Sequence, residues 1–219
     1  MVLKLYKFDA SPPVRAVFLT AAALGLELEL VDVDLLNKDQ MNIEYIEKNP
    51  QHCVPTLDDC GTIVWDSHAI NAYLVSKYGK NDLLYPKDIR KRANVDQRLH
   101  FDSCNLFPIL RFTIRKVLEF GVEDGEDIMS KYYLTEYDKA FEILNSFLDK
   151  SKWVAGDNLT IADFSLISTV TSLECIVPLD FKKYPKIAEW IQRVQELPYY
   201  NVTAKGLKVL KEFLDDLMK

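Results

Sequence analysis

The stretch DASPPVRAVFLT, residues 9–20, places the hydroxyl of Ser11 in front of two prolines and an apolar run with helical spacing. Proline is favoured in the first turn of a helix, because its missing N–H would be unpaired there anyway. Ser11 therefore stands at an expected helix N-terminus, where free backbone donors and the helix dipole favour an anion. Taken alone, the pattern favours a helix cap over a catalytic hydroxyl, because serine before a helix is most often its N-cap.

A second stretch, QHCVPTL at 51–57, contains a proline within an apolar, strand-like run. Proline cannot donate to a sheet ladder, so the pattern indicates an edge strand, a bulge or a cis peptide bond. A cis bond between Val54 and Pro55 would turn the backbone N–H and C=O of Val54 outward. These groups could then pair with an extended peptide, although an ordinary edge strand explains the pattern equally well.

A third stretch, Asp66-Ser67-His68, opens an expected helix. Asp66 is a good N-cap. A carboxylate beside a hydroxyl and free backbone N–H groups is also a cradle for an amino-acid head group, since the acid binds the ammonium and the N–H donors bind the carboxylate.

One helix face in the second half is apolar except for Arg111. Phe107, Leu110, Arg111, Ile114 and Leu118 fall at offsets 0, 3, 4, 7 and 11 and so share that face. An arginine on such a face usually pairs with a carboxylate or extends to solvent. The alternative is a pocket that receives an anion.

The first eighty residues, which must position these groups, alternate between strand and helix signals. The expected elements are a strand at 2–8, a helix after Ser11, a strand at 26–30, a helix at 42–48, strands at 54–57 and 62–65, and a helix at 67–78. The segment YGKNDLLYPKD then indicates a linker.

Beyond the linker only helix signals remain. They cover 89–120 with a break at Pro108, 128–148, 161–176, 186–197 and a last stretch through 214. Thr160 and Asp163 have the spacing of a capping box. We therefore expect an α/β domain at 1–80, a linker at 81–88 and an all-helical domain at 89–219.

The chain carries 27 Lys and Arg against 33 Asp and Glu, a net charge of −6, and its basic residues are scattered. This argues against nucleic acid or an acidic membrane as a partner. The N-terminus lacks the apolar core of a signal peptide, and the longest apolar stretch, 161–173, is too short to span a bilayer. We expect a cytoplasmic protein with four free thiols, whose spacing predicts no metal site.

Together, the motifs SPPVRAV, NPQHCVPTL, DSHA, YLVSKYG and LTIADFS resemble the cytosolic glutathione transferases, and most of all the insect epsilon class within the delta/epsilon type. The resemblance covers about residues 3–200. It implies a thioredoxin-like first domain, a helical-bundle second domain, glutathione as co-substrate in the cleft between them, a homodimer, and detoxifying conjugation of hydrophobic electrophiles.

The resemblance also implies a role for each site residue. Ser11 would donate a hydrogen bond to the glutathione sulfur, Val54 would pair with the cysteinyl backbone, and Asp66 and Ser67 would hold the γ-glutamyl end. The implied glutathione-binding residues are Gln40, His52, Cys53, Val54, Pro55, Asp66, Ser67, His68 and Arg111. The implied wall of the hydrophobic pocket is Phe107, Leu110, Arg111, Ile114 and Leu118, with Leu35 or Leu36.

Gln40 departs from the epsilon pattern, which often has a second histidine in this segment. Gln40 donates a hydrogen bond but carries no charge, so we expect a weaker grip on the glycine carboxylate. The apolar residues of the pocket are compatible with conjugation, peroxide reduction, dehydrohalogenation and isomerisation, so the sequence leaves the type of reaction open.

Three rival functions fit less well. A serine hydrolase needs a GxSxG motif, which the chain lacks. A thiol-disulfide oxidoreductase needs a cysteine at the position of Ser11. The third is a non-catalytic ligand carrier of the same fold, which could keep the same residues.

Overall fold

The computed structural model describes residues 2–120 and 131–217. Its first part is built on a mixed sheet with the strand order β2-β1-β3-β4. The strands are β1 (Leu3–Lys7), β2 (Leu28–Asp32), β3 (Thr56–Asp59) and β4 (Thr62–Trp65). β1 pairs with β2 in parallel and with β3 antiparallel, and β3 pairs antiparallel with β4. This arrangement confirms the expected thioredoxin-like domain.

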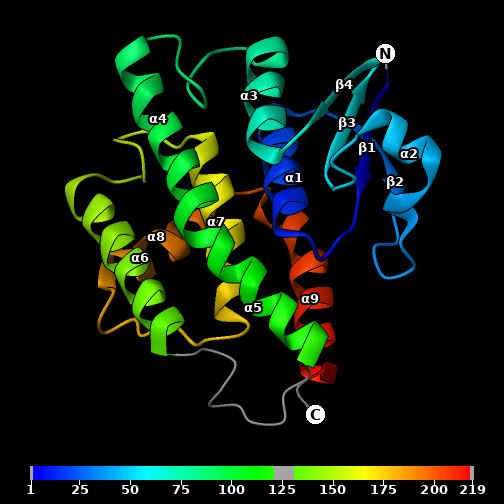
Figure 1. The fold of residues 1–219 in the computed structure, drawn as a ribbon. Helices are drawn as coiled ribbons and strands as arrows, with labels where there is room; N and C mark the ends of the chain where they lie inside the picture. Colours follow the sequence, from blue (N-terminus) through cyan, green and yellow to red (C-terminus); the bar gives the residue numbers. More distant parts are fainter. Residues whose placement is uncertain (1, 121–130, 218–219) are drawn as a thin grey trace.

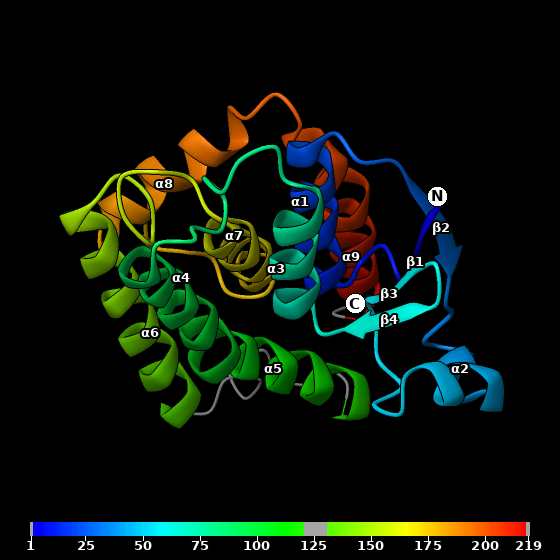
Figure 2. The ribbon, with the colours of Figure 1, turned by 90° about the horizontal axis from the view of Figure 1, so that it is seen from above.

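Two helices cover one face of this sheet. They are α1 (Pro12–Leu24) and α3 (Ser67–Tyr78), while the short α2 (Ile43–Lys48) follows a single 3-10 turn (Asp39–Met41). Figure 2 shows α1 and α3 between the sheet and the helical half of the molecule. The sheet and these two helices share an apolar core, whose fully buried members are Leu5, Val14, Val17, Leu57, Ile70 and Leu74.

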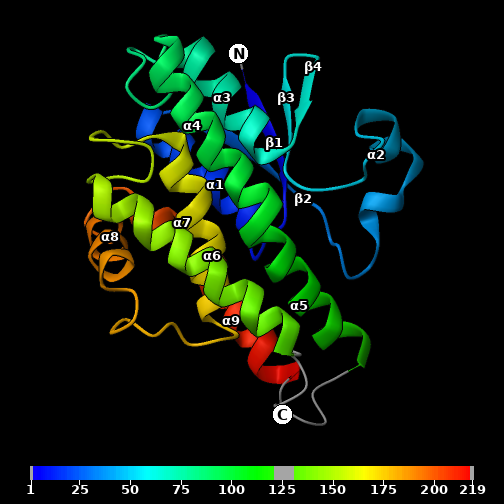
Figure 3. The ribbon, with the colours of Figure 1, turned by 60° about the vertical axis from the view of Figure 1, so that its left-hand side comes forward.

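The second part of the chain contains helices and short helical turns. They are α4 (Ile89–Phe101), a π-helical segment (Asp102–Leu106), α5 (Phe107–Phe120), α6 (Lys131–Lys150), α7 (Ile161–Glu174), α8 (Pro185–Gln195), a 3-10 turn (Tyr200–Thr203) and α9 (Ala204–Leu217). Figures 1 and 3 show α7 surrounded by the other helices, with α1 packed against it from the first part. This confirms an all-helical second half.

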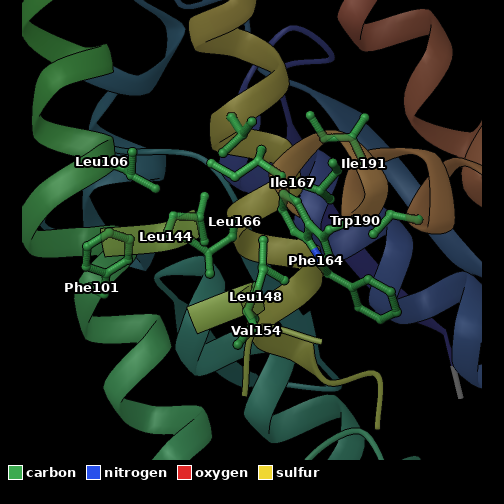
Figure 4. Close-up of a cluster of buried hydrophobic side chains, with 14 of the residues drawn as sticks. Phe101, Leu106, Leu144, Leu148, Val154, Phe164, Leu166, Ile167, Trp190 and Ile191 are labelled. Atoms are coloured by element: carbon green, nitrogen blue, oxygen red, sulfur yellow. The ribbon is translucent and has the colours of Figure 1, made fainter. Parts of the chain in front are cut away.

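Helix α7 is the centre of the larger core. Phe164, Leu166 and Ile167 of α7 are buried against Trp190 of α8 and Leu144 of α6 (Figure 4). Asp163, in the first turn of this helix, helps to cap its N-terminus as the sequence predicts. Its Oδ2 accepts hydrogen bonds from the Thr160 N–H at 2.9 Å and the Thr160 hydroxyl at 3.1 Å. The expected capping box is present.

Several expected boundaries differ from the structure, among them that of β3, which runs from Thr56 to Asp59 rather than over 54–57. β2 begins at Leu28 rather than 26, because the N–H of Leu26 closes the end of α1 by donating to the Ala21 carbonyl at 2.9 Å. The break in 89–120 is a π-helical segment that ends just before Pro108, not at Pro108 itself. Pro108 lies in the first turn of α5, and the chain adjusts on its N-terminal side because proline lacks the N–H of a regular helix. The expected helix start at 128 lies outside the described residues.

Candidate active site

A cavity of about 900 Å³ lies where the first domain faces α5 and α7. Its lining includes nearly every site residue expected from the sequence: Ser11, Leu35, Gln40, His52, Cys53, Val54, Pro55, Asp66, Ser67, His68, Phe107, Leu110, Arg111 and Ile114. Leu36 does not line it and is 61% exposed, so of the two expected leucines the structure places Leu35 at the cavity. The side chain of Leu118 lies outside the described ones.

Ser11 occupies the N-cap position of α1, yet its side chain makes no capping hydrogen bond. A capping hydroxyl accepts from the second or third residue of the helix, and here the second is Pro13, which has no N–H. The backbone N–H of Ser11 donates to the Phe8 carbonyl at 2.9 Å, closing a four-residue turn. The expected N-cap position is confirmed, but the hydroxyl makes no capping bond, and Ser11 lines the cavity.

The peptide bond between Val54 and Pro55 is cis. Among the described residues, no hydrogen bond involves the backbone N–H or C=O of Val54. The loop before it is held from inside the domain. The Cys53 carbonyl accepts hydrogen bonds from the hydroxyl of Tyr45 at 2.7 Å and from Nδ2 of Asn49 at 3.0 Å. The backbone of Val54 thus stays available at the cavity.

Asn49 and Tyr45 were not identified from the sequence. Both are buried, and both also bond to the Thr56 hydroxyl, Asn49 at 2.9 Å and Tyr45 at 3.0 Å. Burial raises the pKa of Tyr45 to about 12, so its hydroxyl remains a donor at neutral pH. The only sequence signal was an asparagine and a threonine flanking the proline motif.

His52 and Gln40 both line the cavity. His52 has an exposed side chain and a φ of 41°, and its N–H donates to the Asn49 carbonyl at 2.8 Å. Gln40 is half-buried, and within the described part of the chain its Oε1 has no hydrogen-bond partner. Strained backbone such as that of His52 persists where the surroundings hold it, often at functional sites.

Asp66 is the N-cap of α3, as predicted. Its Oδ1 accepts from the backbone N–H of His68 at 2.9 Å and of Ala69 at 3.2 Å, and its φ is 70°. Asp66 is exposed and Ser67 is buried, and both line the cavity. The two roles expected for Asp66, helix cap and ligand for an amino-acid head group, are therefore compatible. One carboxylate can cap the helix and still present negative charge to a ligand.

His68 connects this helix to the second half of the molecule. Its Nε2 lies 3.1 Å from Oδ2 of Asp102, which is buried in the π-helical segment. Burial opposes charge on the imidazole, but the hydrogen bond and charge of Asp102 and the charge of Asp66 outweigh it and raise the pKa of His68. Asp102 was not predicted from the sequence, because it lies 34 positions from His68.

The α5 side of the cavity combines apolar walls with a cation. Phe107 and Ile114 are half-buried, Leu110 is buried, and Arg111 is exposed. No ion pair or hydrogen bond of Arg111 is present among the residues the structure describes. Its guanidinium therefore pairs with no carboxylate of residues 2–120 or 131–217 and can reach an anion in the cavity.

Further lining residues were missed by the sequence analysis. They are Pro12, Pro13, Ala16, Gln51, Asp102, Ser103, Arg115, Ser165 and Thr169. Ser165 and Thr169 are buried one turn apart on α7, and within the described residues the Ser165 hydroxyl has no partner. The available signal was the spacing of Ser165 and Thr169, whose hydroxyls are four residues apart in FSLISTV and so share one helix face.

The described residues contain neither a cluster of metal ligands nor a membrane-spanning helix. No group of three or more His, Cys, Asp or Glu side chains is arranged to hold a metal ion. None of the helices has the length and apolar character needed to traverse a bilayer.

Comparisons with known proteins show the family of the chain. Residues 5–82 match the family model of the glutathione S-transferase N-terminal domain, and residues 113–202 match that of the C-terminal domain. Glutathione S-transferase 1 of Manduca sexta is 45% identical over 202 residues, which cover 91% of each chain.

Two solved structures extend the similarity to three dimensions. An epsilon-class glutathione S-transferase from the housefly, Musca domestica, is 43% identical with a TM-score of 0.91, covering 98% of this chain and 97% of that one. A glutathione transferase homologue from Drosophila mojavensis with bound glutathione is 44% identical with a TM-score of 0.90, covering 99% and 97%. The chain belongs to the glutathione S-transferase family, is similar to its epsilon class, and is an enzyme that conjugates glutathione.

Proposed function

We propose that the cavity binds glutathione against residues 1–80 and a hydrophobic electrophile against residues 89–219, with 81–88 as the linker. The observation that carries the mechanism is the hydroxyl of Ser11, which stands at the N-terminus of α1 and does not cap it. Its role is to donate one hydrogen bond to the glutathione thiolate. It is not a nucleophile and is never covalently modified.

The energy required supports this role. A free thiol with a pKa near 8.5 is only about 3% ionised at pH 7, and lowering that pKa by two units takes about 2.7 kcal/mol. A hydrogen bond to a charged acceptor contributes about 1.5–3 kcal/mol, and a helix N-terminus about 0.3–1 kcal/mol. The two effects together suffice, so no general base of the protein is needed.

The remaining polar groups of the cavity suit the rest of the tripeptide. The unpaired backbone of Val54 pairs with the cysteinyl residue, and Asp66 with Ser67 holds the γ-glutamyl ammonium and carboxylate. His52 and Gln40 bind the glycine carboxylate. Arg111 contributes a positive charge toward the tripeptide. Cys53, Pro55 and His68 also line the glutathione-binding part of the cavity that we propose.

The apolar wall receives the second substrate. Phe107, Leu110 and Ile114 with Leu35 hold a hydrophobic electrophile in line with the sulfur. The thiolate forms a carbon–sulfur bond with the electrophilic carbon, and the leaving group departs with its electron pair.

We further infer that the enzyme is a homodimer in the cytoplasm. Cys53, Cys60, Cys104 and Cys175 are all free, which suits a reducing compartment. The family's usual assembly supports the dimer, and sedimentation of the purified protein tests it.

The test of the thiolate role is the pKa of the bound glutathione thiol, followed by thiolate absorbance in wild type and Ser11→Ala. We expect this pKa to rise by about one to two units, with a matching loss of turnover of a chloronitrobenzene at pH 7. Ser103→Ala is the matched control, since its hydroxyl also lines the cavity but donates to the Leu99 carbonyl at 3.2 Å. An unchanged thiol pKa in Ser11→Ala would refute the role.

A further inference from the structure

Helix α9 lies outside both matched family models, yet it packs against the turn that carries Ser11 (Figures 1 and 2). This turn runs from Phe8 to Ser11 and is closed by the hydrogen bond between its two ends. Asp9 and Ala10 are its central residues. α9 contacts both of them.

Gly206 is the tightest point of this contact. A Cβ atom at Gly206 would lie 2.1 Å from the carbonyl oxygen of Asp9 and 3.0 Å from Cδ of Arg15. The first distance is impossible for a real side chain, so any other residue must push the Asp9 backbone away. The atom that a side chain at 206 would meet is a backbone oxygen, which cannot rotate away as a flexible side chain could. The observed position of the turn therefore requires glycine at 206.

Charge and apolar packing reinforce the same contact. Nζ of Lys205 lies 2.6 Å from Oδ2 of Asp9, whose Oδ1 lies 2.6 Å from Nζ of the buried Lys7 in β1. Ala10 is buried in a small apolar cluster with Leu210 and Leu214 of α9. Both central residues of the turn are thus fixed between the sheet and α9.

We propose that α9 is a positioning element for Ser11, acting through Gly206 and Lys205 on the backbone of Asp9. The proposal rests on the proposed role of Ser11 as the donor to the thiolate. A shift of the Asp9 carbonyl moves the closed turn and with it the Ser11 hydroxyl, which has no capping bond to hold it in place. The effect must therefore appear in the thiol pKa and in kcat, more than in glutathione binding.

Gly206→Ala is the main variant. We expect kcat to fall roughly tenfold and the pKa of the bound thiol to rise, with KM for glutathione changed less than about twofold. A merely structural role would lower the melting temperature without moving the thiol pKa. Thermal unfolding of each variant is therefore measured beside its kinetics.

Lys205→Ala covers the case in which Gly206→Ala does not fold, since a surface ion pair contributes little to stability. Its matched control is Lys208→Ala: Lys208 is equally exposed on α9, and its acidic partner is Glu212 of the same helix at 3.7 Å. We expect Lys205→Ala to lower kcat about threefold and to raise the thiol pKa, Lys205→Arg to restore both, and Lys208→Ala to change neither.

Ser11→Ala, assayed in parallel, separates the two proposals. If Ser11→Ala raises the thiol pKa while folded Gly206→Ala and Lys205→Ala leave it and kcat unchanged, the positioning role of α9 is refuted and that of Ser11 stands. If Ser11→Ala itself leaves the thiol pKa unchanged, both proposals fail.

Discussion

Nε2 of His68 lies 3.1 Å from Oδ2 of Asp102, joining α3, whose N-terminus carries the proposed head-group cradle, to the π-helical segment of the second half. Both residues line the cavity. The pair therefore couples the geometry of the Asp66–Ser67 cradle to the packing of the two halves.

The first prediction concerns pH. Because the pKa of His68 is raised above its ordinary value of 6.5 in the folded protein, the pair contributes its full stability below about pH 6.5 and loses it as pH rises through the folded pKa. We expect the difference in unfolding free energy between wild type and His68→Gln to shrink from pH 6 to pH 9 in urea titrations. His100→Gln, at an exposed histidine of α4, is the control. A difference that stays constant over this range contradicts the assignment.

The second prediction concerns Gln40, whose Oε1 is buried without a partner among the described residues. Gln40→His supplies a group that becomes cationic at low pH, so we expect the glutathione KM to fall by about two- to fivefold at pH 6. The gain should decline at pH 8 as the imidazole loses its proton. Gln51→His adds a histidine elsewhere on the cavity wall and tests whether position matters. Equal KM values in wild type and Gln40→His would count against the role of Gln40.

The third prediction concerns the buried Asn49. Its Nδ2 donates to the Cys53 carbonyl and the Thr56 hydroxyl, and its Oδ1 accepts from the Gln51 N–H at 2.9 Å. Asn49→Ala removes these three hydrogen bonds and leaves the Gln51 N–H without its acceptor, while Tyr45 still bonds to the Cys53 carbonyl and the Thr56 hydroxyl. We therefore expect a loss of about 2–3 kcal/mol in stability and a raised glutathione KM. Tyr45→Phe removes only the hydroxyl bonds and should cost about 1 kcal/mol. Urea unfolding and steady-state kinetics measure the two effects, and an unaltered KM in folded Asn49→Ala would show that the loop does not position Val54.

The fourth prediction concerns Asp163. Its Oδ1 accepts from the Val154 N–H and from Trp190 Nε1, each at 3.0 Å, and its Oδ2 accepts from Thr160. Asp163→Ala orphans these buried donors and should lower the unfolding free energy by about 3 kcal/mol. Asp157→Ala, an exposed position in the preceding loop, should change it by less than about 0.5 kcal/mol. Calorimetry measures the melting temperature of each variant. Similar melting temperatures for Asp163→Ala and Asp157→Ala would show that the hydrogen bonds of Asp163 are not a major source of stability.

Local features were predictable from the sequence. The bounds of α3 at 67–78 and of β4 at 62–65 follow from an Asp cap, a glycine stop and strand periodicity, and all of these signals lie within the element itself. The capping box at Thr160 and Asp163 is equally local, since both partners are three residues apart. The proline of QHCVPTL predicted an edge strand, a bulge or a cis peptide bond, and the bond between Val54 and Pro55 is cis in the structure.

Other features depended on contacts between distant residues. Leu35 lines the cavity and Leu36 is exposed, because the turn before the 3-10 segment directs the two neighbouring side chains to opposite sides. Asp102 approaches His68 only because α3 packs beside the π-helical segment.

By itself, the sequence determined the helix and strand order, the caps, and the set of residue types that suit a tripeptide thiol, because these depend on spacing along the chain. The tertiary structure alone decided that Arg111 lines the cavity with no carboxylate partner in the part of the chain that the structure describes, and that α9 places Gly206 against Asp9, two residues before Ser11. The physical reason is that close packing between segments nearly 200 residues apart leaves no periodic trace in either segment.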